Sequence, residues 1–403
     1  MSTLDIALIQ MFSPAYQTTI HNLLEDFQYQ ENTHPNLQTL KWSTAWAEMM
    51  KIHQLQEGAV VTEAGDTWMG TLAALNGLRR FMRREVAAIG DGSAFPRAMW
   101  RSCIQHETNN VIAIPWTLES YVVYYRTDLL EKVSIDPAAA FDTPEHFILT
   151  LEKLRAGTDV APFVVPTMAT TFDTLHNSAC WIWGAGGDFL NPNATQTRLS
   201  DPFTRAGLHK YFDIHRFIAP AMQLLDEHIS WNLFLDGQVA VTIRETTLLR
   251  DLLRNSPPRT IAGKFGVATM PGIPLIGGSN LLIWKHATAR QRSAAVKFIK
   301  FLTSEKALLT LFENTGMFPA RLTVLEQLQS PYYAPVIESF TRGRAFHRQR
   351  VWGLVEDRLA PSLNRIWNDL FQTPSANVEA IISRHLDPLE EELAVIITQF
   401  ETQ

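Results

Sequence analysis

Hydrophobic and polar positions along the first third of this chain follow two periods in turn. Residues 4–9 form a nearly continuous apolar run, which predicts a buried strand. After Ser13 and Pro14, apolar residues recur at the 3.6-residue spacing of an amphipathic helix, at Tyr16, Ile20, Leu23, Leu24 and Phe27. Residues 37–40 and 59–63 are interpreted as the next strands, with a helix near 46–55 between them, and continue the alternation. Alternating strands and helices of this kind predict a parallel sheet covered on both faces.

The same pattern returns late in the chain. Gly277 and Gly278 precede the apolar run 281–284, and two helices are predicted after it, one over 292–302 and one from Ser304 to Gly316. The first of these helices presents a single apolar face formed by Ala295, Phe298, Ile299 and Leu302. A bare strand at this point predicts that the chain returns to a sheet that it left earlier, so that several chain passes join two lobes.

The rest of the chain favours helices. Thr143 and Pro144 open a helix that Gly157 ends. Beyond residue 322 the pattern is mostly helical, and we expect breaks at the prolines Pro331, Pro335, Pro361, Pro374 and Pro388.

Three segments carry a resemblance to a known family. They are residues 59–78 (AVVTEAGDTWMGTLAALNGL), 112–130 (IAIPWTLESYVVYYRTDLL) and 234–243 (FLDGQVAVTI), the last with Val241 where methionine is usual. In this order they resemble the third strand with its ligand loop, the crossing between lobes, and a strand entry of extracellular solute-binding proteins of ABC importers. The resemblance is to the sugar-binding family that includes maltose-binding protein, and it covers nearly the whole chain.

That resemblance implies an α/β fold of the periplasmic-binding-protein-like type (type II), with two α/β lobes, a hinge and a ligand cleft. A chain of 403 residues is also too long for one compact core. We assign 1–112 plus 273–318 to the N-terminal lobe and 117–270 plus 322–403 to the C-terminal lobe with its helices. The crossings are expected near Pro115, Pro271 and Pro319.

Charge and cysteine content exclude several classes of protein. The net charge of −6 offers no basic field to attract nucleic acid, and no apolar run is long enough to span a membrane. Cys103 and Cys180 do not make a disulfide framework, and we expect two buried free thiols. The family resemblance implies an extracytoplasmic location, in the periplasm or on a membrane lipid anchor. Because no export signal precedes the first strand, we expect a mature domain; a protein that stays inside the cell is the alternative.

Aromatic candidates for the site come from the carboxyl ends of strands, where open α/β sheets bind ligands. Indole rings cover the C–H faces of sugars. The candidates at strand ends are Trp42, Trp68, Trp116, Trp183 and Trp231, of which Trp42, Trp68 and Trp231 could instead pack in a core. Trp352 is a further candidate, because residues 350–353 resemble a C-terminal segment of the family that often reaches the cleft. Trp68 is the first choice, because it lies just past the third predicted strand.

Polar candidates follow the same reasoning. Gln10, Asp66, Arg244 and Glu245 end strands, Glu119 follows the first crossing, Asp188 follows a glycine cluster, and Gly278 and Ser279 offer backbone N–H groups. Glu119 could instead be a salt-bridged hinge residue, and Arg244 could pair with Glu245.

We expect binding without catalysis, cofactor or metal. The chain, as a monomer, would capture a di- or oligosaccharide and deliver it to the permease subunits of an ABC transporter. A glycoside hydrolase using Glu119 with Asp188 or Asp66 is one alternative, and a sugar sensor outside transport is another. Within the binding class a polyol, a glycerol phosphate or a peptide remains open. The sequence contains no His-Glu-x-x-His, Gly-x-Ser-x-Gly or phosphate-loop motif.

Overall fold

The computed structural model describes residues 2–10, 13–106, 108–168, 172–254 and 260–401. The chain forms two compact α/β units. Unit 1 is Met1–Glu119, Ile276–Gln329 and Arg348–Arg350; unit 2 is Ser120–Leu275, Ser330–His347 and Val351–Gln403. The crossings expected near Pro115, Pro271 and Pro319 each precede a boundary between these segments, and the short excursion at 348–350 was not expected from the sequence.

The sheet of unit 1 starts from β1 (Ser2–Ile9), which pairs in parallel with β2 (Thr33–Leu40) and with β3 (Val61–Gly65). The late strand β8 (Ile276–Ile283) pairs antiparallel with β3, so the prediction that the chain returns to its first sheet is confirmed. β9 (Phe318–Pro319) pairs with the first half of β4 (Ala113–Arg126).

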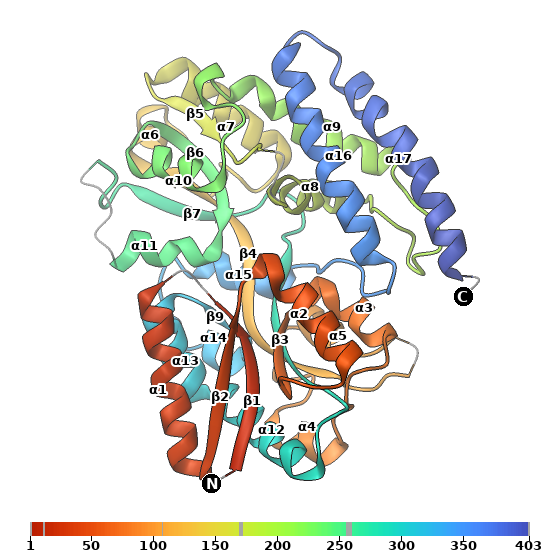
Figure 1. Cartoon of the computed structure of the whole chain (residues 1–403). Helices are drawn as coiled ribbons and strands as arrows, with labels where there is room; N and C mark the ends of the chain where they lie inside the picture. Colours follow the sequence, from red (N-terminus) through yellow and green to blue (C-terminus); the bar gives the residue numbers. More distant parts are fainter. Residues whose placement is uncertain (1, 11–12, 107, 169–171, 255–259, 402–403) are drawn as a thin grey trace. The chain divides into compact units, whose positions relative to one another are not determined.

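The helices of unit 1 follow the predicted apolar faces. α1 (Pro14–Glu31) lies beside β1 and β2 and buries all five residues of its predicted face (Figure 1). α12 (Ala289–Leu302) buries its four predicted residues, and α13 (Glu305–Thr315) is capped by Ser304 and ends at Gly316, as predicted. The other helices are α2 (Trp42–Leu55), α3 (Met69–Ala74), α4 (Arg83–Ile89), α5 (Arg97–Ser102) and α14 (Leu322–Leu325).

Unit 2 is built on the second half of β4, which pairs antiparallel with β6 (Val239–Glu245) and with β7 (Phe265–Thr269). β5 (Ala161–Val164) pairs in parallel with β6. Its helices are α6 (Thr127–Lys132), α7 (Pro144–Gly157), α8 (Asp173–Gly184), α9 (Pro202–Asp213), α10 (Glu227–Leu235), α11 (Leu249–Arg254), α15 (Ala334–Arg342), α16 (Trp352–Gln372) and α17 (Val378–Glu401). The long helices α16 and α17 lie side by side, with α8 and α9 packed against them (Figure 1).

The prediction that prolines interrupt the C-terminal helices is wrong at two positions. Pro361 lies inside α16 and Pro388 lies inside α17. A proline inside a helix costs about 3 kcal/mol. In α16 the buried side chains of Leu359, Leu363 and Ile366 offset that cost, since each contributes roughly 2 kcal/mol.

Cys103 in unit 1 and Cys180 in unit 2 are both buried and free, which confirms the expectation of two free thiols. Within the described residues, no helix combines the length and the apolar character that a membrane span requires.

Candidate functional site

One candidate half-site lies at the carboxyl edge of the sheet in unit 1. Because β1, β2 and β3 run parallel, the residues that follow them meet at this edge. β8 enters the same edge, where Ser279 opposes Gly65 at the end of β3. This edge therefore brings together six residues chosen from the sequence, which are Gln10, Trp42, Asp66, Trp68, Gly278 and Ser279.

Three indole rings form an aromatic ledge at this edge, made of Trp42, Trp46 and Trp68. The ring centroid of Trp68 lies 5.3 Å from that of Trp42 and 6.0 Å from that of Trp46. A Cβ on Gly65 would come within 3.3 Å of the Trp42 ring, so the glycine leaves room for this packing. Trp42 remains 45% exposed. The ledge thus presents the exposed indole of Trp42, supported by the inclined ring of Trp68, as an apolar surface that a ligand could contact.

Two carboxyl groups with raised pKa values belong to β3 and to the turn that follows it, the buried Glu63 and the partly exposed Asp66. Asp66 accepts a hydrogen bond from the backbone N–H of Gly278 at 3.1 Å, and burial raises its pKa to about 7. Glu63 accepts from the backbone N–H of Ile9 at 2.7 Å, and burial raises its pKa to about 7 as well, against the opposing effect of hydrogen bonds from Ser279 and Ile9. Glu63 was not a candidate from the sequence. Through these hydrogen bonds Glu63 links β3 to β1, which contains Ile9, and to β8, which contains Ser279.

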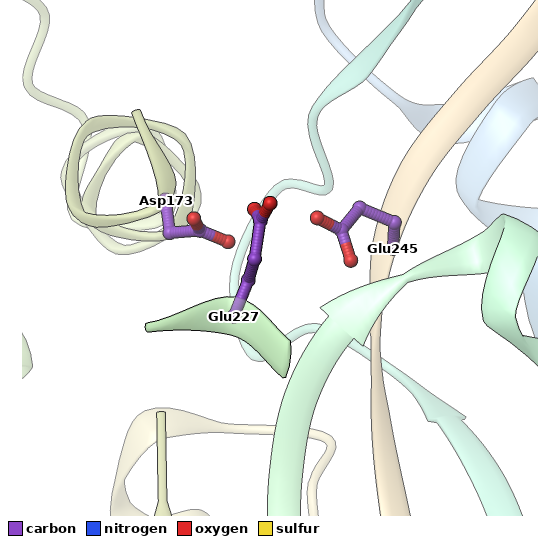
Figure 2. A group of neighbouring side chains, drawn as sticks. All are labelled: Asp173, Glu227 and Glu245. Atoms are coloured by element: carbon purple, nitrogen blue, oxygen red, sulfur yellow. The ribbon is translucent and has the colours of Figure 1, made fainter. Parts of the chain in front are cut away.

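A second half-site lies at the carboxyl edge of the sheet in unit 2. β5 and β6 are parallel, so the segments that follow them meet there. Asp173 is the first residue of α8, which follows β5, and Glu245 ends β6. Glu227 is the first residue of α10, which packs on β6. Figure 2 shows the three carboxylates pointing toward one another, and one ligand atom from each lies within 4.8 Å of the others. These three residues are called the carboxylate triad below.

Arg244 supplies a positive charge to this half-site. Its guanidinium lies 2.7 Å from a carboxylate oxygen of Glu245 and donates to the backbone carbonyl of Glu227 at 2.8 Å. Burial alone would lower the pKa of Arg244, but the charges of Glu245 and Asp173 outweigh it and raise that pKa. The arginine therefore stays cationic, and one positive charge faces three carboxylates.

A neutral hydrogen-bonding pair lies one helical turn further along α8. The hydroxyl of Tyr121 and Nδ1 of His176 are 3.1 Å apart. Burial lowers the pKa of His176 to about 4, so its imidazole is neutral at pH 7. The exposed ring of Phe172 stacks on it, with centroids 6.1 Å apart. The second half-site thus also combines polar groups with an aromatic surface.

The carboxylate triad has the oxygen donors that Mg²⁺ or Ca²⁺ prefers. Three carboxylates supply at most half of the six or more oxygens of such a site if each binds through one atom, and Arg244 already bonds to one of them. The donor set suits hydrogen-bond donors on a ligand better than a metal ion.

Asp188 and Trp183 belong to a different network in unit 2. Asp188 is bound by Arg344, by His347 at 3.0 Å and by the indole N–H of Trp183 at 3.3 Å. Burial alone would raise the pKa of Asp188, but His347 and Arg344 hold it below its ordinary value. This network ties the loop after α8 to the segment before α16.

The remaining candidates lie apart from the two edges or inside cores. The rings of Trp116, Trp231 and Trp352 are buried, and Trp231 packs edge-on against Tyr124 at 5.1 Å. A ring without exposed surface reaches a ligand only if its surroundings move. Glu119 is the half-buried last residue of the first segment of unit 1.

Sequence reasoning missed several residues of the second half-site, namely Tyr121, Asp173, His176 and Glu227. One signal was available for two of them. Asp226 is a side-chain N-cap, which marks Glu227 as the first residue of a helix. Asp173 likewise opens the helix after β5, and first-turn residues of such helices lie at the carboxyl edge of the sheet.

Solved structures match this fold over its whole length. The sugar-binding protein MalE from Xanthomonas citri superposes with a TM-score of 0.83 at 18% identity, covering 100% of both chains. Maltose-bound MalE3 of T. maritima gives 0.80 at 20% identity, covering 98% of this chain and 100% of its own. An ABC transporter solute-binding protein from Agrobacterium radiobacter K84, in complex with ribitol, gives 0.75 at 18% identity and covers 99% and 98%. The fold is therefore that of MalE-type periplasmic binding proteins.

The sequence itself gives the family. The model for bacterial extracellular solute-binding proteins matches residues 22–335, and the chain belongs to that family. This finding confirms the resemblance noted in the sequence. No curated protein matches the sequence.

Proposed function

We propose that this chain is the substrate-binding component of an ABC importer, and that its ligand is a neutral polyhydroxylated molecule, a sugar or a polyol. Family membership supports solute binding. Structures of the same fold include one bound to maltose and one bound to ribitol, which supports this ligand class.

The carboxylate triad is the observation that carries this proposal. Each carboxylate of Asp173, Glu227 and Glu245 offers several acceptor positions and no donor. Sugar hydroxyls are donors that satisfy such acceptors. A phosphate is an anion and mainly an acceptor of hydrogen bonds, and among these side chains only Arg244 would attract it, so the triad favours a neutral ligand over a glycerol phosphate.

The aromatic ledge of unit 1 complements the triad. An exposed indole such as Trp42 stacks on the C–H face of a pyranose, while Asp66 offers a polar group beside the ledge. A sugar ring has an apolar face and a hydroxyl rim, which match the chemistry of the aromatic ledge and of the carboxylate triad respectively.

The proposed cycle is capture followed by delivery. The ligand binds, and its differential affinity for the open and closed states of the protein drives closure. The liganded chain, a monomer outside the cytoplasmic membrane, then docks on the permease subunits of the transporter.

Thermal shift and calorimetry on the full chain test the ligand class. The panel holds maltose, trehalose, ribitol and sn-glycerol 3-phosphate. A neutral sugar or polyol at about 100 times its Kd should stabilise the chain by about 2.7 kcal/mol. Binding of the glycerol phosphate with no binding of the neutral compounds would refute the proposed ligand class.

A glycoside hydrolase is the second candidate, because the triad places carboxylate oxygens within 4.8 Å of one another. Retaining hydrolases use carboxyl groups about 5–5.5 Å apart. The proposal of binding expects every oligosaccharide to be recovered intact after prolonged incubation, as measured by chromatography. Release of shorter sugars would favour the enzyme.

A further inference from the structure

A loop of the chain leaves unit 2 for three residues and returns. Arg348–Arg350 belong to unit 1, whereas His347 and Val351 on either side belong to unit 2. The rings of Phe346 and Trp352 stack at the base of this loop, with centroids 4.7 Å apart and planes 19° apart. We call residues 347–351 the latch loop and 348–350 its tip.

The base of the latch loop is fixed within unit 2. Asp188 binds both Arg344 and His347, and the guanidinium of Arg344 lies 4.9 Å from the ring centre of Trp183. Trp352 is the first residue of α16 and is fully buried. The residues on both sides of the tip are therefore held within unit 2 by hydrogen bonds and ring contacts.

The tip docks on α3 of unit 1 through backbone atoms. A Cβ on Gly70 would lie 2.5 Å from the carbonyl oxygen of Arg348 and 2.8 Å from that of Gln349, so only glycine admits the tip. The hydroxyl of Thr71 donates to the carbonyl of Arg350 at 3.1 Å. The Arg348 side chain adds a hydrogen bond to the carbonyl of Arg101 at 3.4 Å.

α3 continues directly from the Asp66–Trp68 segment. That segment is a single 3-10 turn, and α3 begins at the next residue, Met69. Met69 and Leu72 of α3 are buried, so their side chains fix the face of the helix that packs in the core. The tip covers α3 at Gly70 and Thr71, so the helix that directly follows Trp68 is held by its core face and by the latch loop.

We propose that the latch loop positions the Asp66–Trp68 segment for the ligand through α3, with Gly70 and Thr71 as positioning residues. The ligand part of this inference rests on the proposed function. The docking part concerns the free protein. The loop thereby links the C-terminal helices of unit 2 to the aromatic ledge of unit 1 through the covalent chain.

The substitution Gly70→Ala tests the docking, because a docked tip and an uncovered α3 predict opposite changes in the hydrogen-exchange rate. Alanine is a better helix former than glycine, so in an uncovered α3 it should leave hydrogen exchange unchanged or slower. With the tip docked, the added Cβ displaces it. Thr71→Val removes the hydroxyl at nearly constant volume and serves as the second variant if Gly70→Ala fails to fold. Thr71→Ser retains the hydroxyl and is the matched control.

The first measurement is hydrogen–deuterium exchange on the free full-length chain. Gly70→Ala and Thr71→Val should speed exchange several-fold in peptides covering 66–74 and 345–352, and Thr71→Ser should match the wild type. Unchanged or slower exchange in both variants overturns the proposal. This measurement needs no ligand, so it stands even if the proposed function fails.

The second measurement is calorimetry with maltose, or with ribitol if the wild type binds only that compound. Gly70→Ala and Thr71→Val should each weaken binding about 10-fold, and the control Thr71→Ser should bind with the affinity of the wild type. Faster exchange with unchanged affinity overturns the positioning role. If neither compound binds the wild type, the proposed ligand class loses its support, and the exchange data alone decide whether the latch loop holds the segment.

Discussion

The buried carboxyl of Glu63 predicts a specific pH dependence of stability. Its side chain is 2% exposed and accepts a hydrogen bond from the backbone N–H of Ile9 at 2.7 Å. The substitution Glu63→Gln keeps an acceptor oxygen for that N–H and removes the ionisation. A comparison of the two proteins therefore isolates the cost of ionising this one group.

The magnitude follows from the raised pKa. The pKa of Glu63 rises from an ordinary 4.5 to about 7 in the folded protein, because burial disfavours the charged form. A difference of about 2.5, at about 1.36 kcal/mol per pKa unit, gives about 3 kcal/mol. Between these pKa values the folded state binds more protons than the unfolded state, so stability falls as the pH rises. The contribution is complete below about pH 4.5 and is lost as the pH passes 7.

Urea unfolding at about pH 5 and about pH 8.5 measures this effect. The unfolding free energy of the wild type relative to Glu63→Gln should fall by about 2.5 kcal/mol between the two conditions, because part of the contribution is already lost at pH 5. Other titrating groups are common to both proteins and cancel in the comparison. A difference between the two proteins that stays constant with pH would refute the reasoning from burial.

Four further substitutions test the site and the core. Trp68→Ala should weaken sugar binding by about 1–3 kcal/mol in calorimetry, and unchanged affinity removes Trp68 from the site. Glu245→Gln should weaken it by about 1.5–3 kcal/mol, whereas the same change at Glu152, a partly exposed residue paired with Arg216, should leave sugar binding unchanged; equal affinities of the two variants contradict a role for the triad. Asp188→Asn should lower the unfolding free energy by about 3 kcal/mol in urea, because it breaks a partly buried pairing with Arg344 and His347, and wild-type stability would show that this network contributes little. Trp367→Ala should cost about 3–5 kcal/mol, and a loss below 1 kcal/mol would mean that the surrounding core collapses into the space.

Much of the fold was predictable because local periodicity and burial agree. The apolar faces of 14–31 and 289–302 point to the cores that they enter, and the apolar run after Gly278 forms the returning strand. The breaks expected at Pro361 and Pro388 were wrong, because tertiary packing of two long helices outweighs a local penalty that the sequence alone displays.

The candidate site was less accessible to sequence reasoning. Residues that directly follow strands, such as Gln10 and Asp66, could be named from the alternation of elements. Asp173 and Glu227 meet Glu245 only because a parallel strand pair and a packed helix bring three distant segments to one edge. The number of tryptophans was evident from the sequence, but whether a given ring lies exposed as Trp42 does or buried as Trp116 does depends on contacts that no local pattern encodes.

The two cysteines have a practical consequence. Burial raises the pKa of the Cys180 thiol to about 12 and raises that of Cys103 further still, so neither forms a reactive thiolate at neutral pH. A single cysteine introduced on the surface would then react selectively with a maleimide dye while the native thiols remain in place. A dye could therefore be attached at one chosen surface position without replacing Cys103 or Cys180.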